Sequence, residues 1–327
     1  MQLFMVSASH SPLLDFPAKE SPAVLNVRAA LAATRARIEA FDPDLVVLFG
    51  VDHYGGQHMA CMPSFCVGVE ATALADVGGT PGRLDVPRDL AIQAVGAIRK
   101  AGVDTAVSYD MAVDHGFSQA LSRLLGGVDR YPVLPIFVSC IQPPFSPFAR
   151  ARALGEAVGG FVKTLDRQRV LFVGSGGLAH NPAALFPPID SVGPEWRPYI
   201  LHGRAQAEVP QQAWIDFEIQ AHQMGAQMLA ADQVTPEMAG LKDAWDKAFL
   251  AAYCAGDLSV FDAWDPDQVM AEAGIGAVET QAWIAAAAAM QAAGGARPRA
   301  VFQEIAKEIG IGFGVAEAGP SPLSPAP

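Results

Sequence analysis

Four of the seven histidines in this chain stand where a strand-like apolar run gives way to a loop. His10 follows the run LFMVSA, His53 follows LVVLFG, His115 comes after the stretch TAVSY, and His180 follows VLFVG. Each has Gly, Ser, Asp or Pro close by, as is typical of loops and turns. In an open α/β sheet, ligands bind in the crevice outside the carboxyl ends of the strands, so we expect these four loops to meet in one site.

Imidazole side chains in such a site predict a metal centre, acid–base catalysis, or both. Neutral imidazole binds Fe, Zn and Cu, and it exchanges protons readily near neutral pH. The other three histidines carry a weaker signal. His58 lies shortly after His53, where a role in the loop is expected, whereas His202 and His222 fall in polar helical stretches and are expected to be solvated.

The elements that must position these residues alternate between short apolar runs and helical patterns, which is typical of an α/β fold. A continuous apolar run such as LVVLFG is typical of a strand that is buried on both faces. After residue 190 the pattern becomes mainly helical. The expected strands cover residues 3–8, 45–50, 61–69, 105–109, 133–138 and 170–174, and the expected helices cover residues 22–41, 90–101, 148–165, 207–230, 236–255, 266–273 and 277–293.

The sequence therefore predicts an α/β fold with a three-layer core and a central mixed sheet over residues 1–190. The helical C-terminal part is expected to pack on this core, so that residues 1–315 form a single domain. Residues 316–327 are rich in Pro and Ser and are expected to be a disordered tail.

Composition excludes several classes of partner and compartment. The net charge is −12, which argues against nucleic acid, because phosphate binding needs clustered Lys and Arg. The four cysteines are too few and too scattered for a disulfide framework, which favours a reducing compartment. The chain shows no signal-peptide pattern and no apolar tract of membrane-spanning length, so a cytoplasmic protein without a membrane partner is expected.

Two motifs that would indicate other functions do not fit the sequence, and one alternative class of enzyme remains open. The segment GSGGLA at residues 174–179 matches a dinucleotide fingerprint, but His180 and Pro182 interrupt the helix that should follow. Ser175 does not fit a hydrolase nucleophile elbow, because Val173 stands where that motif requires glycine. A two-metal hydrolase also gathers histidines at strand ends and is the main alternative, although the chain contains no H-x-H pair.

Four long motifs resemble the class III extradiol ring-cleavage dioxygenases: FGVDHYGG, MPSFCVGVEATA, AVSYDMAVDHGFSQ and VLFVGSGGLAHNP. The nearest subgroup acts on 2,3-dihydroxyphenylpropionate and 2,3-dihydroxycinnamate. The resemblance is strong over residues 1–185, thinner through the helical part, and stronger again over residues 273–290. It implies a catalytic domain that opens the ring of a catechol with O₂, and a homo-oligomer.

The resemblance also implies a site. The family holds Fe(II) with two histidines and a glutamate of a Glu-x-x-x-Trp helix, which here fall on His10, His53 and Glu279; Glu272 is the fallback for the carboxylate, and Mn(II) in place of iron is compatible with the same ligands. His115 and His180 then resemble the family's acid–base pair, with His180 favoured as base and His115 as acid. Asp52 and Asp114, each just before a histidine, are expected either to orient that histidine or to cap the following segment.

Overall fold

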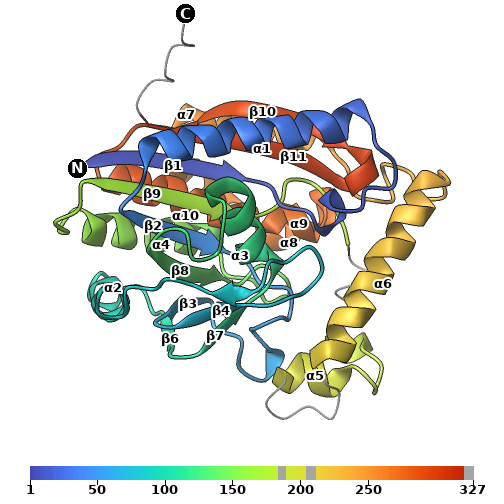
Figure 1. Cartoon of the computed structure of the whole chain (residues 1–327), viewed down its shortest axis with the longest axis horizontal. Coiled ribbons are helices and arrows are strands. Elements are labelled where there is room, and N and C mark those ends of the chain that lie inside the picture. Colours follow the sequence, from blue (N-terminus) through green and yellow to red (C-terminus); the bar gives the residue numbers. More distant parts are fainter. Residues whose placement is uncertain (183–188, 204–210, 320–327) are drawn as a thin grey trace, which may run out of the picture.

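A central eight-stranded sheet organises the computed structural model of the chain, which describes residues 1–182, 189–203 and 211–319 (Figure 1). Its strand order is β10-β11-β1-β9-β2-β8-β3-β6. The strands are β1 (Gln2–Ala8), β2 (Leu45–Gly50), β3 (Phe65–Gly68), β6 (Ala106–Ser108), β8 (Val133–Val138), β9 (Arg169–Ser175), β10 (Arg299–Ala306) and β11 (Ile311–Ala318).

The middle of this sheet is parallel, which fixes where the site can form. Strands β1, β9, β2 and β8 run parallel to one another, so their carboxyl ends share one edge. The sheet is mixed because β11 pairs antiparallel with β1, β10 with β11, and β3 with β8. A second sheet lies beside it, with the order β5 (Gly82–Arg83), β4 (Ala71–Ala73) and β7 (Met111–Val113).

Helices cover both faces of the main sheet and make the expected three layers. Alternate residues of β2 face opposite sides: Val46 and Leu48 join the apolar cluster under α1 (Pro22–Phe41), whereas Val47 and Phe49 join the cluster under α4 (Phe148–Val162) and α10 (Thr280–Ala292). Figure 1 shows α1 and α3 (His115–Ala120) on the near side of the sheet and α10 behind it. Burial of both faces explains the uninterrupted apolar run of β2.

Close packing of α10 against α4 anchors the C-terminal half to the sheet. A Cβ atom on Gly155 of α4 would stand 2.1 Å from the carbonyl oxygen of Ala285, and one on Gly159 would stand 2.2 Å from that of Ala289. The two helix backbones therefore touch where these glycines lie. Glu279 precedes α10 directly, so this packing also fixes the position of its backbone.

Several predicted elements are confirmed with their bounds, namely α1, β2, β8 and α8 (Pro266–Ala273). The predicted strand at residues 61–69 shortens to β3, and the predicted helix at residues 277–293 divides at Glu279. The start of the predicted helix at residues 207–230 lies outside the described residues. Further α-helices are α2 (Arg88–Lys100), α5 (Arg197–His202), α6 (Gln211–Ala230) and α7 (Asp243–Ala255), and the short α9 (Ile275–Val278) precedes α10.

Strands β10 and β11 are the main departure from the prediction of a mainly helical C-terminal part. Strand β11 pairs with β1, Met5 opposite Ala318 and Ala8 opposite Val315, so the chain returns to the central sheet after the helices. The predicted tail at residues 316–327 therefore begins too early, because β11 continues through Ala318; residues 320–327 lie outside the described part.

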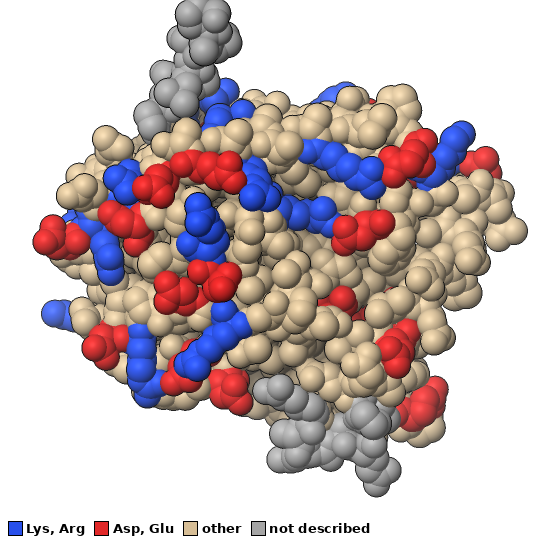
Figure 2. Space-filling model, viewed as in Figure 1, with Lys and Arg blue, Asp and Glu red and all other residues tan. Residues whose placement is uncertain are grey.

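Charged side chains of both signs are interspersed over the face in Figure 2, and they do not gather into a basic patch there. All four cysteines are free thiols. Among the described residues, no helix combines the length and the apolar character needed to cross a bilayer.

Candidate active site

The shared edge of the parallel strands brings the loops of three predicted histidines together. His10 follows β1, His53 follows β2 and His180 follows β9, and these strands are neighbours in the order β1-β9-β2. His115 reaches the same place by another route. It follows β7 of the second sheet rather than the strand predicted at residues 105–109, and it begins α3.

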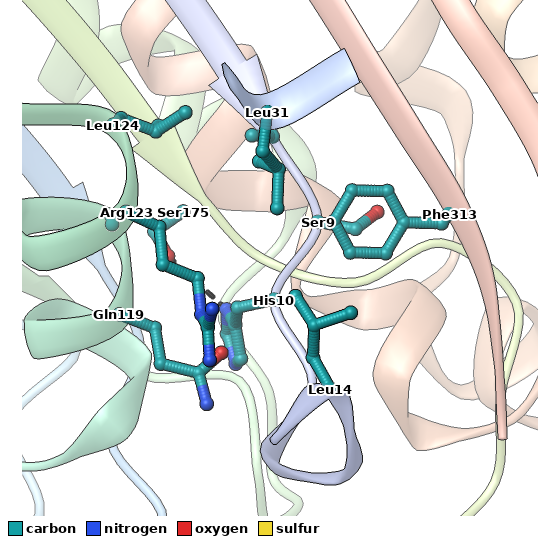
Figure 3. A pocket seen from close by; sticks show the side chains of 11 residues that line it. Ser9, His10, Leu14, Leu31, Gln119, Arg123, Leu124, Ser175 and Phe313 are labelled. Atoms are coloured by element: carbon teal, nitrogen blue, oxygen red, sulfur yellow. Dashed lines mark hydrogen bonds between the residues drawn. The ribbon is translucent and has the colours of Figure 1, made fainter. Parts of the chain in front are cut away.

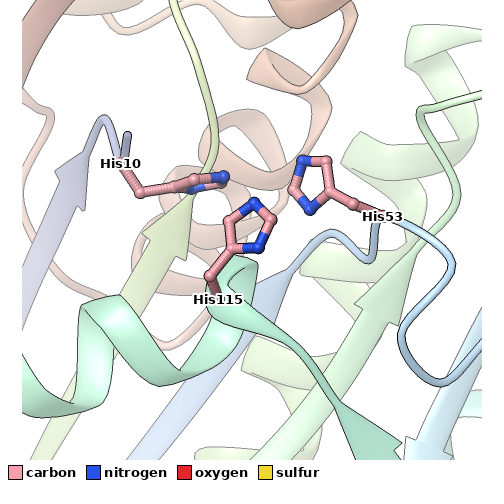
Figure 4. A group of neighbouring side chains, drawn as sticks. All are labelled: His10, His53 and His115. Carbon is pink, nitrogen blue, oxygen red and sulfur yellow. The ribbon is translucent and has the colours of Figure 1, made fainter. Parts of the chain in front are cut away.

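The rings of His10, His53 and His115 face one another (Figure 4). Ring nitrogens of all three lie within 4.8 Å of one another, and all three side chains are buried. The His10 and His53 rings are nearly perpendicular, with centroids 5.4 Å apart, whereas His53 and His115 stack at 4.2 Å with an interplanar angle of 18°.

Hydrogen bonds at Nδ1 orient three of the imidazoles so that Nε2 is left for the cavity. His180 Nδ1 donates to the carbonyl of Leu178 at 2.9 Å, and His115 Nδ1 lies 2.6 Å from Oδ2 of Asp76. His10 Nδ1 lies 3.1 Å from the hydroxyl of Ser175. Partners of this kind fix the tautomer and the ring orientation of a functional histidine.

The carboxylate of Glu279 faces both His10 and His53. Its Oε2 lies 3.8 Å from Nε2 of His10, and its Oε1 lies 3.6 Å from Nε2 of His53. The carboxylate is 1% exposed, and Oε2 has no hydrogen-bond partner among the described residues. A buried carboxylate oxygen without a donor is costly unless a cation or a proton occupies the space before it.

Electrostatics of this cluster favour an ionised Glu279. Burial opposes ionisation, but the neighbouring imidazoles, His53 above all, outweigh it and lower the pKa of Glu279 to about 2. Burial also opposes a charged His53, yet the carboxylates of Asp114 and Glu279 raise its pKa well above the usual value. Burial lowers the pKa of His10 to about 3, so that ring is neutral.

Glycines allow the loops to converge at this edge. A Cβ atom on Gly116 would stand 2.4 Å from the carbonyl oxygen of Val51, and one on Gly176 would stand 2.5 Å from that of Glu279. A side chain at Gly116 would push apart the loops that carry His53 and His115, and one at Gly176 would push the loop after β9 away from Glu279.

Asp52 and Asp114 divide the two roles predicted for them. The Asp52 carboxylate accepts the backbone N–H groups of Gly56 and Gln57, which caps the loop after β2. Asp114 caps α3 by accepting the N–H of Gly116 at 2.8 Å, and its other oxygen lies 3.3 Å from Nδ1 of His53. It therefore both caps a helix and faces a histidine.

The remaining predictions have mixed outcomes. His202 is exposed as expected, and His58 precedes a short 3₁₀ helix with its ring edge-on to Tyr199. The prediction for His222 is wrong: it lines the same cavity as the site histidines, and its Nδ1 donates to the carbonyl of Glu218 at 2.7 Å. Glu272, the fallback carboxylate, is exposed on α8, away from the site.

A cavity of about 450 Å³ opens in front of the four histidines predicted for the site. Its size is within the range of small-molecule sites. Helix α6 and the segment 309–311 supply most of the opposite wall, which is largely apolar; its side chains include Phe217, Met224, Met228, Leu229, Val234, Ile309 and Ile311.

Sequence comparisons agree with this geometry. The family described as the catalytic LigB subunit of aromatic ring-opening dioxygenase matches residues 5–314, and the chain belongs to this family. It is a ring-cleaving dioxygenase that acts on a catechol, as similar proteins also indicate. A protein of Mycobacterium ulcerans is 40% identical over 98% of this chain and 100% of its own length, and one of Escherichia coli K12 is 39% identical over 96% and 98%; both are named 2,3-dihydroxyphenylpropionate/2,3-dihydroxicinnamic acid 1,2-dioxygenase.

Two residues of the site were not identified by sequence reasoning. Asp76 lies 39 positions before His115 in a Gly-containing loop and gave no local signal. Ser175 was considered only as a nucleophile, yet it contacts His10. Both contacts depend on tertiary structure. The glycines after Asp76, of which Gly78 has φ +68°, mark a tight turn but do not indicate a histidine partner.

Proposed function

We propose that the chain is an Fe(II)-dependent extradiol dioxygenase whose metal is held by His10, His53 and Glu279. The observation that carries this proposal is the buried Glu279 carboxylate, whose oxygens face both Nε2 atoms at 3.8 and 3.6 Å. These separations exceed hydrogen-bond lengths. They suit atoms that bind one ion at about 2.1 Å, which lie roughly 3 to 4 Å apart. Two histidines and one carboxylate are also the donor set typical of non-haem Fe(II) oxygenases.

His115 is close enough to compete with Glu279 for the third position, but the orientation of its ring argues against it. A metal ion bound by histidine lies near the ring plane, about 2.1 Å from the nitrogen. The His115 and His53 rings are stacked and nearly parallel at 4.2 Å, so one ion cannot lie in both planes. The perpendicular His10 and His53 rings can share an ion.

When held by His10, His53 and Glu279, the Fe(II) ion would supply a centre at which the catechol and O₂ can be bound together. The chain's own groups manage the protons. His180 has its Nδ1 hydrogen on the Leu178 carbonyl, and burial lowers its pKa, so a neutral Nε2 can take a proton from a substrate hydroxyl. The Asp76 carboxylate can stabilise a positive charge on His115. His115 is therefore suited to donate a proton to a substrate oxygen during ring opening.

The cavity supports a catechol that carries a short side chain. The ring hydroxyls would face the histidines, and the side chain would extend along the apolar wall toward Asn181 and His222. Lysine and arginine are absent from the lining as far as the described residues go. Following the names of the similar proteins, we propose 2,3-dihydroxyphenylpropionate and 2,3-dihydroxycinnamate as the first substrates to test. The cytoplasmic location and the homo-oligomeric state stay predictions.

The direct test is to load the purified protein with Fe(II) anaerobically and then add a catechol and air. We expect O₂ uptake in a 1:1 ratio with a yellow ring-opened product. The panel should contain 2,3-dihydroxyphenylpropionate, its methyl ester, protocatechuate, gallate and homoprotocatechuate, with the first giving the highest kcat/KM. If the protein is instead a two-metal hydrolase, the alternative from the sequence, none of these compounds should cause O₂ uptake. A higher kcat/KM for the methyl ester than for the acid would contradict only the proposed preference for a carboxylate on the substrate side chain.

A further inference from the structure

Ser175 ends β9 with a buried hydroxyl that touches two parts of the site at once. Figure 3 shows one of these contacts, with His10. Its Oγ donates to the carbonyl oxygen of Gly116 at 2.6 Å and lies 3.1 Å from Nδ1 of His10. The family assignment and the proposed mechanism give this residue no role.

The single hydrogen of the Ser175 hydroxyl determines which atom donates in its contact with His10. A serine hydroxyl has one hydrogen, and here it goes to the Gly116 carbonyl, which can only accept. The contact with His10 therefore requires that Nδ1 carries the hydrogen and that Ser175 accepts it. The lone pair of His10 then lies on Nε2, the atom that faces Glu279.

The same hydroxyl also links two segments that are far apart in sequence. Gly116 directly follows His115 at the start of α3, whereas His10 lies in the loop after β1. Ser175 itself pairs with Ala8, at the end of β1. A change at this hydroxyl would leave both the Gly116 carbonyl and Nδ1 of His10 without this partner in a buried place.

We propose that Ser175 is a positioning residue that holds His10 in the Nδ1-H tautomer and aims its Nε2 at the metal. This inference rests on the proposed role of His10 as a metal ligand. It requires the hydroxyl and not merely a small buried side chain. Partners of this kind change metal affinity by about 10- to 100-fold when they are removed from a histidine ligand.

Ser7 provides a matched control. It is also a fully buried serine, and it pairs with Gly174 in the neighbouring strand, but its hydroxyl bonds to Tyr253 at 2.9 Å and not to a histidine. Ser175→Thr tests rescue, because it keeps the hydroxyl and a small cavity lined by Leu31, Leu124 and Phe313 lies beside this position.

The experiment measures the Fe(II) dissociation constant anaerobically, by competition with a chromogenic chelator, in the full-length protein. We expect Ser175→Ala to weaken Fe(II) binding by about 10- to 100-fold, whereas Ser175→Thr and Ser7→Ala stay within about threefold of wild type. An unchanged constant in Ser175→Ala, or an equal loss in Ser7→Ala, would overturn the proposal.

A second measurement needs no variant. Nitrogen-15 spectra of histidine in the metal-free wild-type protein report the tautomer, and we expect the His10 hydrogen on Nδ1; a hydrogen on Nε2 would also overturn the proposal. His10→Ala separates the two levels of inference. If His10→Ala retains normal Fe(II) affinity, the proposed ligand set fails; if it loses Fe(II) while Ser175→Ala does not, only the role of Ser175 fails.

Discussion

Replacing His115 by phenylalanine separates acid–base chemistry from metal binding. The aromatic ring keeps the stacking volume against His53, so the ligand loop should stay in place. The lost imidazole removes one of the two N–H groups that Asp76 accepts, while the backbone N–H at 2.8 Å remains. Loss of one partner from a buried carboxylate costs about 1–3 kcal/mol of stability, which a folded protein of this size tolerates.

The rate of ring cleavage should be affected more strongly by His115→Phe than the free energy of unfolding. A positioned general acid or base contributes about 10²- to 10⁴-fold in rate, or roughly 3–5 kcal/mol of transition-state stabilisation. We therefore expect His115→Phe, and likewise His180→Gln, to bind one Fe(II) per chain and to lose ring cleavage by this factor. Glu279→Ala should instead lose the metal, because it removes the only carboxylate that faces both His10 and His53 among the described residues.

The assay has three parts. Anaerobic gel filtration followed by metal analysis gives Fe(II) per chain, single-turnover absorbance gives ring cleavage, and thermal unfolding shows that each variant is folded. Fe(II) lost from His115→Phe but retained by Glu279→Ala would make His115 the third ligand and refute the geometric argument from stacked rings.

Three further predictions follow from the surroundings of the site. Fe(II) binding should tighten by up to about tenfold per pH unit between pH 6 and 8, because the raised pKa of His53 means that the ion must displace a proton from this ring. Chelator competition across this pH range measures the Fe(II) affinity, and an affinity that does not change with pH would contradict the prediction. Asp246 of α7 accepts the backbone N–H of Ala179, directly before His180, and burial raises its pKa to about 7. The native state therefore binds more protons than the unfolded chain, and wild-type stability should fall by at most about 4 kcal/mol as pH rises from about 4 to 7. Urea unfolding should show Asp246→Asn gaining stability over wild type across this range, and a constant difference would count against it. Gly276→Ala should retain Fe(II) but lose turnover, because the new Cβ atom would stand 1.9 Å from the His180 ring; normal single-turnover rates would show that His180 is not needed where it lies.

The parallel middle of the sheet was predictable because its signals are local. Strands β2 and β8 are short continuous apolar runs, and α1 has a serine cap, a proline at its first position and buried residues at helical spacing. The positions of His10, His53 and His180 follow from the ends of β1, β2 and β9 once the carboxyl ends of these strands are taken to share an edge.

Strands β10 and β11 were not predicted because β11 contains glycines and a charged residue that tertiary contacts require and that weaken a strand pattern. Glycines weaken a strand pattern, yet a Cβ atom on Gly312 would stand 1.9 Å from Asp246, and one on Gly314 would stand 2.7 Å from Leu178. Glu317 is buried in β11 because Arg37 reaches it from α1. The identities of these residues depend on contacts with distant parts of the chain, which the pattern of a single sequence does not reveal.

The same limit applies to the partners of the histidines. Histidine positions followed from strand ends, but Asp76 and Ser175 reach His115 and His10 only through the folded chain. His222 was misjudged for a related reason. The polar residues around it on α6 indicated an exposed helix face, whereas the structure turns this residue into the cavity.

The partners at Nδ1 give the imidazoles different chemistry although they share one cavity. His180 places its Nδ1 hydrogen on a backbone carbonyl, which offers no negative charge to offset a second proton, so the ring stays neutral. His115 faces the carboxylate of Asp76, which can offset a positive charge on the ring. The histidine residues alone leave the order of the acid–base pair open. From their partners we infer that the base is the ring beside the carbonyl and the acid is the ring beside the carboxylate.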